Sequence, residues 1–381
     1  PHTMSLNSML RAVMASPDRL GITRGCLLMI SLLCWNARGQ SQMTSVPVET
    51  RSTLLSIDRS MSPKAGFRLM DPMKTGVVFT NLLASERHMT NQMLLNGSGV
   101  CAGDVDRDGL VDLYFTSLDG PNRLYRNRGQ WRFEDITLAA GLDCPESDST
   151  ACVFADLDGD ADLDLLVHTM YRGLRVFQNN GELKFTEKTQ AAGMVAAKGG
   201  MSLAVADYDL DGDLDIYVTR YRSEAMMDEV QATVRIKTVG SEQSVSHFNN
   251  RPTTDPDLRN RFYIDQRGGI GEYGEVDTLY RNLGGFAFEA VDWTDGTFLD
   301  DQAKPLSEPP RDWGLAVQFH DLNHDGWPDL YVCNDFDTPD RIWVNTGKGS
   351  FQAMAPQTLR QTSWFSMGMD VADVNRDGED D

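Results

Sequence analysis

Oxygen-bearing side chains recur at offsets 0, 2, 4 and 8 in five stretches of this 381-residue sequence. In the first stretch a glycine, Gly109, follows the third carboxylate and allows a sharp turn. Carboxylate and amide oxygens at alternate positions suit a hard cation such as Ca2+ better than a transition metal. We therefore predict up to five Ca2+ sites, with these ligands: Asp104, Asp106, Asp108 and Asp112; Asp156, Asp158, Asp160 and Asp164; Asp207, Asp209, Asp211 and Asp215; Asp321, Asn323, Asp325 and Asp329; Asp373, Asn375, Asp377 and Asp381.

The residues after these stretches are typical of β-strands. An EF-hand also begins with Asp at alternate positions and a Gly, but it needs a bidentate Glu at the twelfth position and flanking helices. In the first four copies the twelfth position holds Phe115, Val167, Val218 and Val332, so an EF-hand is rejected. We expect the ninth-position Asp to close each site inside a β-hairpin turn, where the ion stabilises the scaffold rather than doing chemistry.

The second stretch departs from the pattern. Its glycine, Gly159, comes earlier, and Ala161 takes the position of the turn glycine. If that position needs a left-handed backbone, the alanine costs about 1 kcal/mol. A plain acidic surface, which is the alternative interpretation of these runs, would require neither the glycine nor the fixed offsets.

Composition limits the possible partners. The chain is 41% hydrophobic and 24% charged, which is typical of a globular protein, and its net charge of -21 disfavours nucleic acid and anionic membranes. Eighteen of the twenty predicted ligands are carboxylates. Five Ca2+ ions would bring ten positive charges and reduce the net charge from -21 to -11, so much of the acidity belongs to the predicted sites.

The acidic stretches belong to a longer repeat. Asp104 and Asp156 are 52 residues apart, and Asp156 and Asp207 are 51 apart. Between them, short β-rich runs alternate with Gly/Asn turns, and an Asn-to-Phe hairpin of constant length returns at 127–133, 179–185, 282–288 and 345–351. A period near 50 with about four strands is typical of propeller blades, whereas a β-sandwich needs roughly 100 residues. We predict an all-β fold, a β-propeller of four-stranded antiparallel blades. The strand-like pattern begins at about Phe67 and includes a hairpin piece at Asn91–Asn96.

The interval from Asp207 to Asp321 is 114 residues long but contains the hairpin only once. We interpret it as one blade with an insertion at 221–278 rather than as two blades. Long loops on rigid scaffolds often carry function. A capping or disordered loop is the alternative.

The start of the chain resembles an export signal. Arg19 and Arg24 precede about ten apolar residues, which are too few for a spanning helix, and Ala37-Arg38-Gly39 follows. We predict a signal peptide at 1–39, a linker at 40–63 and the propeller at 64–381, with no membrane insertion. A buried helix is the alternative for the apolar run. Four cysteines would then remain, Cys101, Cys144, Cys152 and Cys333, and their pairing stays open.

These residues together make the chain similar to the FG-GAP (VCBS-like) repeat proteins, whose blades are those of integrin α-subunit propellers. More narrowly, it resembles the extracellular, cartilage-acidic-protein-like group that carries a C-terminal ASPIC/UnbV domain. The resemblance covers about 65–381 and is carried by 91–112, 122–141, 207–219 and 313–334. It implies a Ca2+-bearing propeller with seven blades when complete, of which about five to six are represented here. It also implies that the chain lacks its C-terminal part, including the ASPIC/UnbV domain.

We expect an exported protein, secreted, periplasmic or on the cell surface, that binds extracellular protein or glycan ligands in an adhesion role and is not an enzyme. The alternative is a carbohydrate-active enzyme, a polysaccharide lyase or hydrolase on a Ca2+-stabilised propeller. The sequence contains no G-x-S-x-G or H-E-x-x-H motif. A catalytic carboxylate pair remains open, because Asp is so abundant.

Overall fold

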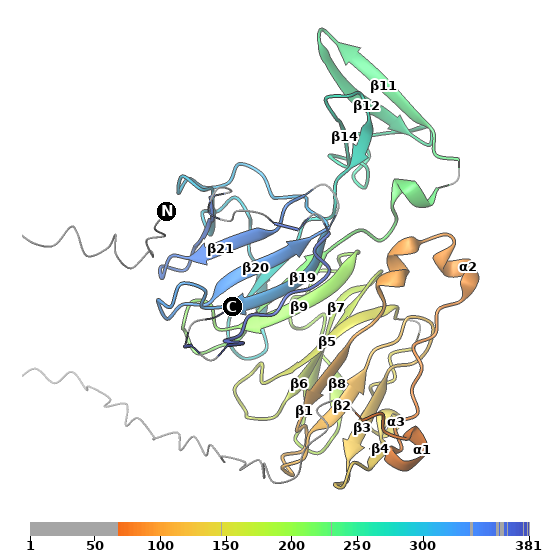
Figure 1. Cartoon of the computed structure of the whole chain (residues 1–381), viewed down its shortest axis with the longest axis vertical. Coiled ribbons are helices and arrows are strands. Elements are labelled where there is room, and N and C mark those ends of the chain that lie inside the picture. The colour runs from red at the N-terminus through yellow and green to blue at the C-terminus, as the bar shows by residue number, and fades with distance from the viewer. Residues whose placement is uncertain are drawn as a thin grey trace, which may run out of the picture. The chain divides into compact units, whose positions relative to one another are not determined.

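Three four-stranded antiparallel sheets and one five-stranded sheet follow one another along the described part of the chain (Figure 1). The structure is a computed structural model that describes residues 68–381, except 146, 230, 336–337, 356–357, 359–361, 364, 376, 379 and 381. The predicted signal peptide and linker, and the predicted ligand Asp381, lie outside the described residues. In the part that is described, no helix has the length and apolar character needed to cross a bilayer.

Each sheet is one propeller blade, and we number the blades I to IV. Blades I and II consist of β1 (Val100–Gly103), β2 (Asp112–Phe115), β3 (Arg123–Asn127) and β4 (Phe133–Asp135), then β5 (Ser149–Ala155), β6 (Asp164–Thr169), β7 (Gly173–Asn179) and β8 (Phe185–Glu187). Blades III and IV consist of β9 (Gly200–Ala206), β10 (Asp215–Arg220), β16 (Thr278–Asn282) and β17 (Phe288–Ala290), then β19 (Gly314–His320), β20 (Asp329–Asn334), β21 (Arg341–Asn345) and β22 (Phe351–Ala353). The short β18 (Phe298–Leu299) adds to blade IV in parallel with β22. The predicted all-β architecture of four-stranded blades is confirmed.

The register of the first hairpin is the same in every blade. The ninth-position Asp is the first residue of the second strand, and it pairs with the last residue of the first strand. Asp112 pairs with Gly103 in blade I, and Asp329 pairs with His320 in blade IV. Each acidic stretch is therefore the turn between the first two strands of a blade. The fifth stretch follows β22 without a strand around it among the described residues.

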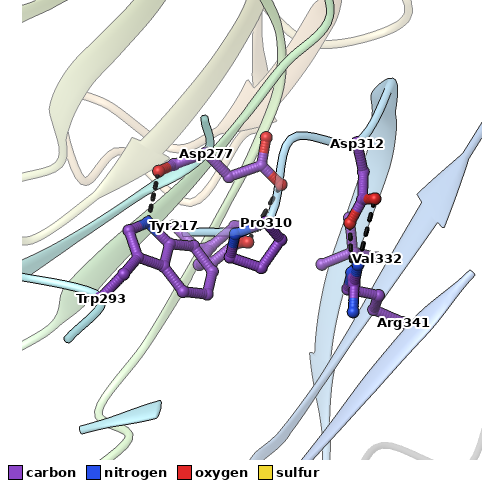
Figure 2. Close-up of a pocket in the computed structure, with 7 residues that line it drawn as sticks. All are labelled: Tyr217, Asp277, Trp293, Pro310, Asp312, Val332 and Arg341. Atoms are coloured by element: carbon purple, nitrogen blue, oxygen red, sulfur yellow. Dashed lines mark hydrogen bonds and ion pairs between the residues drawn. The ribbon is translucent and has the colours of Figure 1, made fainter. Parts of the chain in front are cut away.

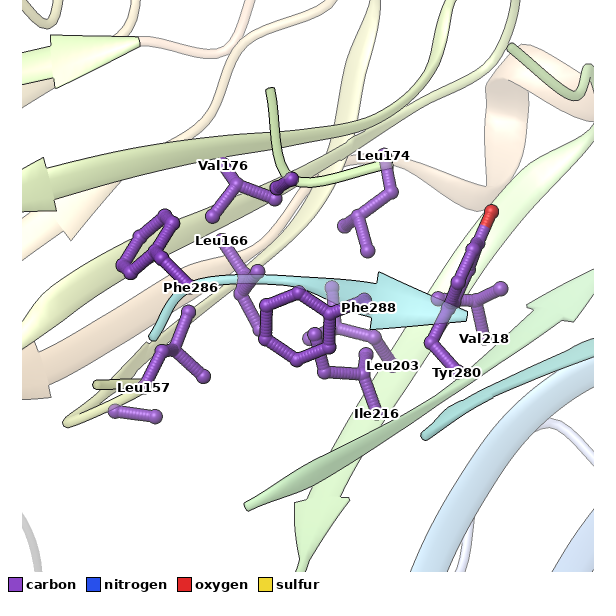
Figure 3. Close-up of a cluster of buried hydrophobic side chains, with 12 residues drawn as sticks. Leu157, Leu166, Leu174, Val176, Leu203, Ile216, Val218, Tyr280, Phe286 and Phe288 are labelled. Atoms are coloured by element: carbon purple, nitrogen blue, oxygen red, sulfur yellow. The ribbon is translucent and has the colours of Figure 1, made fainter. Parts of the chain in front are cut away.

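The hydrophobic core lies between neighbouring blades. Figure 3 shows the cluster between blades II and III, where Leu166 and Val176 meet Ile216 and Phe288. A second cluster joins Tyr114 of blade I to Leu165 of blade II, and another joins blade III to blade IV. Neighbouring blades therefore bury apolar side chains against one another. The four cysteines among the described residues are free thiols, and all but the partly buried Cys101 are buried.

The segment before β1 is helical, so the prediction of strand from about Phe67 and of a hairpin at Asn91–Asn96 is wrong for the described residues. It contains α1 (Pro72–Thr75), α2 (Ser85–His88) and the 3-10 helix η2 (Gln92–Asn96). The Asn91 side chain caps η2 by accepting from Met93 N at 3.0 Å. That turn buries Met93 and Leu94 together, which explains why adjacent apolar residues there do not form a strand. The helical turn α3 (Thr137–Ala140) follows β4.

Residues 221–277 lie between two strands that pair directly. Val218 of β10 pairs with Thr278 of β16, so the interval from Asp207 to Asp321 contains one blade, as predicted. The inserted residues form η3 (Met226–Asp228) and two small sheets, β11 (Val234–Val239) with β12 (Glu242–Phe248) and β13 (Arg251–Pro252), and β14 (Phe262–Ile264) with β15 (Ile270–Glu272). β11, β12 and β14 project away from the blades (Figure 1). The buried Glu272 holds the base of the insertion, where it pairs with Arg222 and Arg261.

Candidate metal centres

The first Asp of every acidic loop closes its turn by accepting backbone N–H groups. We number the acidic loops I to IV after their blades. In loop I, Asp104 accepts from Asp108 N at 3.1 Å and from Gly109 N at 2.8 Å. The equivalent bonds form in the other loops, at the first-position residues Asp156, Asp207, Asp321 and Asp373. The fifth acidic stretch therefore adopts the same turn, although no described strand follows it.

The ninth-position Asp is buried, and both of its carboxylate oxygens accept hydrogen bonds from backbone N–H groups. The exposed fraction is 0% for Asp112, 1% for Asp164 and 1% for Asp215. One oxygen of Asp164 accepts from Leu157 N at 3.0 Å, and the other accepts from Asn179 N at 2.8 Å. Blades I, III and IV have the same pair of bonds. This carboxylate therefore ties its loop to the third strand of the blade, in addition to any part in holding an ion.

Burial raises the pKa of Asp164 and of Asp215 to about 7, although backbone N–H donors oppose the rise. The other carboxylates of each loop raise it further. An ionised carboxylate at these positions is therefore costly near neutral pH. A divalent cation in the loop would offset that cost, because it favours the charged form.

Three of the loops bring carboxylate oxygens within 4.8 Å of one another. The groups are Asp104, Asp106 and Asp108 in loop I, Asp156, Asp158 and Asp164 in loop II, and Asp207, Asp209 and Asp215 in loop III. Loop IV has Asn323 at the second ligand position, where its side chain accepts from Asp325 N at 2.9 Å. The structure thus brings together most of the predicted ligands of loops I to III and gives loop IV the same turn.

The buried oxygens of these groups show whether a cation fits. Oδ1 of Asp158 and Oδ1 of Asp209 are buried, and no described residue donates a hydrogen bond to them. A buried carboxylate oxygen without a donor is costly. Three converging carboxylates with an unsatisfied oxygen are a donor set for a hard divalent cation, so loops II and III fit Ca2+. Such an ion would supply positive charge that lets the loop close.

The turn geometry confirms the expectation for the second loop. Ala161 has φ 69°, in the left-handed region, where the other loops have glycine with φ 84° at Gly109 and 99° at Gly212. Gly159 has φ 75° at a position where the neighbouring loops use Arg107 and Leu210. Loop II thus places an alanine where the backbone favours glycine.

Exchanging these residues should move stability in opposite directions. Ala161→Gly is expected to raise the free energy of unfolding by about 0.5–1 kcal/mol, because relief of the left-handed strain outweighs the extra freedom of the unfolded chain. Gly109→Ala is the matched control and should lower the free energy of unfolding by about as much. Its added Cβ would meet nothing within 4 Å, so the left-handed backbone alone causes the loss. Urea unfolding of both variants measures the difference. A loss of stability in Ala161→Gly would contradict the prediction.

The asparagine that ends the third strand of blades II, III and IV joins its blade to the preceding one, a role that the sequence did not reveal. Nδ2 of Asn179 donates to Val105 O in loop I at 2.9 Å and to Leu163 O in its own loop at 3.1 Å. Asn282 and Asn345 likewise reach Leu157 and Tyr208 of the preceding loops. The recurrence of Asn in the hairpins was the available signal, but the partner residue in the preceding blade could not be inferred from it.

A small cavity of about 10 Å³ lies beside the partly buried Asp277 in blade III (Figure 2). Asp277 accepts from Tyr217 Oη at 3.0 Å and from Arg220 N at 2.7 Å, and burial raises its pKa to about 7. Asp340 makes the same two contacts in blade IV. The Asp–Tyr pair is therefore a repeated support of the blades rather than a feature of one site.

Comparison with known proteins agrees with this geometry. A family model described as FG-GAP-like repeat matches residues 104–167, 156–218 and 321–381. The chain therefore contains FG-GAP-like repeats in these residues. It is similar to cartilage acidic protein 1, being 24% identical over 324 residues to the Homo sapiens protein, with 76% of this chain and 47% of that protein covered. The Xenopus tropicalis protein is 31% identical over 141 residues, which cover 34% of this chain and 22% of that protein.

The chain thus spans about half the length of the human and Mus musculus relatives. Two solved lectin structures are also similar. One is a lectin of Agrocybe aegerita, described as recognising non-reducing terminal N-acetylglucosamine, at 14% identity and TM-score 0.27, with 68% of each chain covered. The other is Aleuria aurantia lectin with α-methyl-L-fucoside, at 11% identity and TM-score 0.26, with 68% of this chain and 79% of the lectin covered.

Proposed function

We propose that this chain is an exported calcium-binding β-propeller that acts as a non-catalytic binding or adhesion module for extracellular ligands. The observation that carries the proposal is the common design of the acidic loops. Each loop is a hairpin turn, and its ninth-position Asp is tied to backbone N–H groups in the four blades. An ion bound there would stabilise the scaffold and leave ligand binding to other parts of the surface.

The ligand site in this proposal is a pocket of about 470 Å³ where the insertion meets blade IV. Phe262 and Tyr273 of the insertion supply aromatic rings. Two acidic side chains, Glu308 and Asp312, and two basic ones, Arg311 and Arg341, complete the polar wall. The charges balance, so the pocket favours a neutral polar ligand over an ion. Aromatic rings beside planar hydrogen-bonding groups suit a glycan chain, and the volume is within the range of ligand pockets.

The test is a binding screen with immobilised glycans and extracellular-matrix proteins. Tyr273→Ala should lower the affinity for the ligand at least about tenfold, as expected when a buried aromatic contact is lost. Trp131→Ala is the matched control, because Trp131 is an exposed aromatic residue of blade I, 68% accessible. Equal binding by both variants would remove the pocket from the proposal. Turnover of a polysaccharide without retention on it would overturn the non-catalytic role.

A further inference from the structure

The residue before each hairpin asparagine differs among the four blades. Blades I and III have arginine, Arg126 and Arg281, whereas blade II has Gln178 and blade IV has Val344. This position lies at the end of the third strand, next to the asparagine whose N–H bonds to the ninth-position Asp. The long side chains at this position therefore lie close to the acidic loop of their own blade.

In loop I this side chain is a cation within the carboxylate group. The Arg126 guanidinium forms an ion pair with Asp106 and lies 3.3 Å from Asp108 Oδ2. Both carboxylates belong to the group that fits a cation. The Asp106 side chain is only 8% exposed, so solvent screens the pair weakly. Loop I therefore already holds one positive charge that belongs to the chain.

In loops II and III the side chain before the asparagine brings less positive charge to the carboxylates than in loop I. In loop III, Arg281 donates to Tyr208 Oη at 3.0 Å, and its Nε is 3.9 Å from Asp209 Oδ2. In loop II, the neutral Gln178 donates to Asp158 Oδ2 at 2.6 Å and leaves Oδ1 of Asp158 without a donor among the described residues. The residue before the asparagine thus places a positive charge close to the carboxylate group in loop I, farther from it in loop III, and none in loop II. Arg107 of loop I also reaches loop II, where it pairs with Asp162, which is not a member of the carboxylate group.

We propose that the residue before the hairpin asparagine sets the Ca2+ affinity of each loop, so that loop II fills first, loop III second and loop I last. The inference rests on the Ca2+ binding proposed above. A guanidinium a few ångströms from two ligand carboxylates repels a divalent cation and occupies oxygens that the cation needs. An amide at the same position donates one hydrogen bond and adds no charge.

One glycine in each loop allows the three sites to be observed separately. The amides of Gly109, Gly159 and Gly212 each donate to the first Asp of their loop, at 2.8, 2.9 and 3.0 Å. In the full chain labelled with 15N-glycine and freed of metal, Ca2+ titration should shift the Gly159 resonance at the lowest concentration. The Gly212 and then the Gly109 resonance should follow, with at least about a tenfold separation between the first and the last.

Reciprocal exchange of the side chains supplies the decisive variants. Arg126→Gln should lower the Ca2+ concentration at the Gly109 midpoint at least about tenfold, and Gln178→Arg should raise that of Gly159 by a similar factor. The Gly212 midpoint should stay unchanged in both. Arg128→Gln is the control, because Arg128 lies on the same hairpin and pairs with Glu134. Far-UV circular dichroism checks that each variant is folded.

Unchanged midpoints in both exchanges would overturn the inference, and so would a higher Gly109 midpoint in Arg126→Gln, which would show that Arg126 organises the ligands. In either case the proposed Ca2+ binding would stand. If no glycine of the wild-type chain responded to Ca2+, the proposed binding and the grading would both fall.

Discussion

Excess EDTA is expected to lower the free energy of unfolding of the Ca2+-loaded chain by about 2.7 kcal/mol for each site held at a hundred times its dissociation constant. With the three carboxylate groups of loops I to III occupied, the total is about 8 kcal/mol, which corresponds to a fall of roughly 10 °C or more in Tm. The physical reason is that the converging carboxylates repel one another, and two of them have raised pKa values because they are buried. Differential scanning calorimetry with and without EDTA measures the effect.

Two controls separate bound calcium from general screening. Potassium chloride at matched ionic strength screens the net charge of -21 but does not occupy the loops. The double variant Asp158→Asn with Asp209→Asn should lose much of the response to EDTA, because it removes one carboxylate from loop II and one from loop III. If EDTA left the Tm of the wild-type chain unchanged, the ions would not be part of the scaffold.

Asn179→Ala is expected to lower the free energy of unfolding by about 3 kcal/mol or more. Asn179 is 2% exposed, and its loss leaves the carbonyls of Val105 and Leu163 without that donor, each at a cost of about 1–3 kcal/mol. Asn127 is the matched control from blade I. Its Nδ2 donates to Val111 O of its own loop, at 2.9 Å, and Asn127→Ala should cost about half as much. Urea unfolding at constant m value provides the comparison.

Asn179→Asp isolates the part played by the donor. The aspartate keeps the oxygen that accepts from Gly181 N at 3.2 Å, but it cannot donate to Val105. A stability near that of Asn179→Ala would assign the effect to the link between blades. Equal losses in the two alanine variants, Asn127→Ala and Asn179→Ala, would contradict that assignment.

The sequence was sufficient for features that arise from local spacing. Asp104 and Gly109 are five positions apart, and their hydrogen bond is a property of the turn itself. The four-strand unit followed from the Asn-to-Phe hairpin, because antiparallel neighbours are adjacent in the chain. The single blade between Asp207 and Asp321 could be predicted for the same reason, since the hairpin occurs there once.

Features that depend on distant partners could not be predicted. Asn179 and Val105 are 74 positions apart, and nothing at either residue identifies the other. Nothing in the sequence distinguishes Arg126 from any other strand arginine, and only the fold shows that it lies beside Asp106. The segment at 91–96 was predicted wrongly because its short apolar run suits either a strand or a 3-10 turn, and the capping contact of Asn91 decided the outcome.

The pairing of Val218 with Thr278 has a consequence for how such a chain can vary. The two points where the insertion leaves and rejoins blade III are cross-strand neighbours, whose Cα atoms lie about 5 Å apart in any antiparallel pair. A segment of any length can replace residues 222–276 without straining β10 or β16, provided that its own ends meet at about that spacing and Asp277 keeps its bonds to Tyr217 and Arg220. The inserted segment can therefore be exchanged by grafting, while the acidic loops at the opposite end of the same strands remain unaltered.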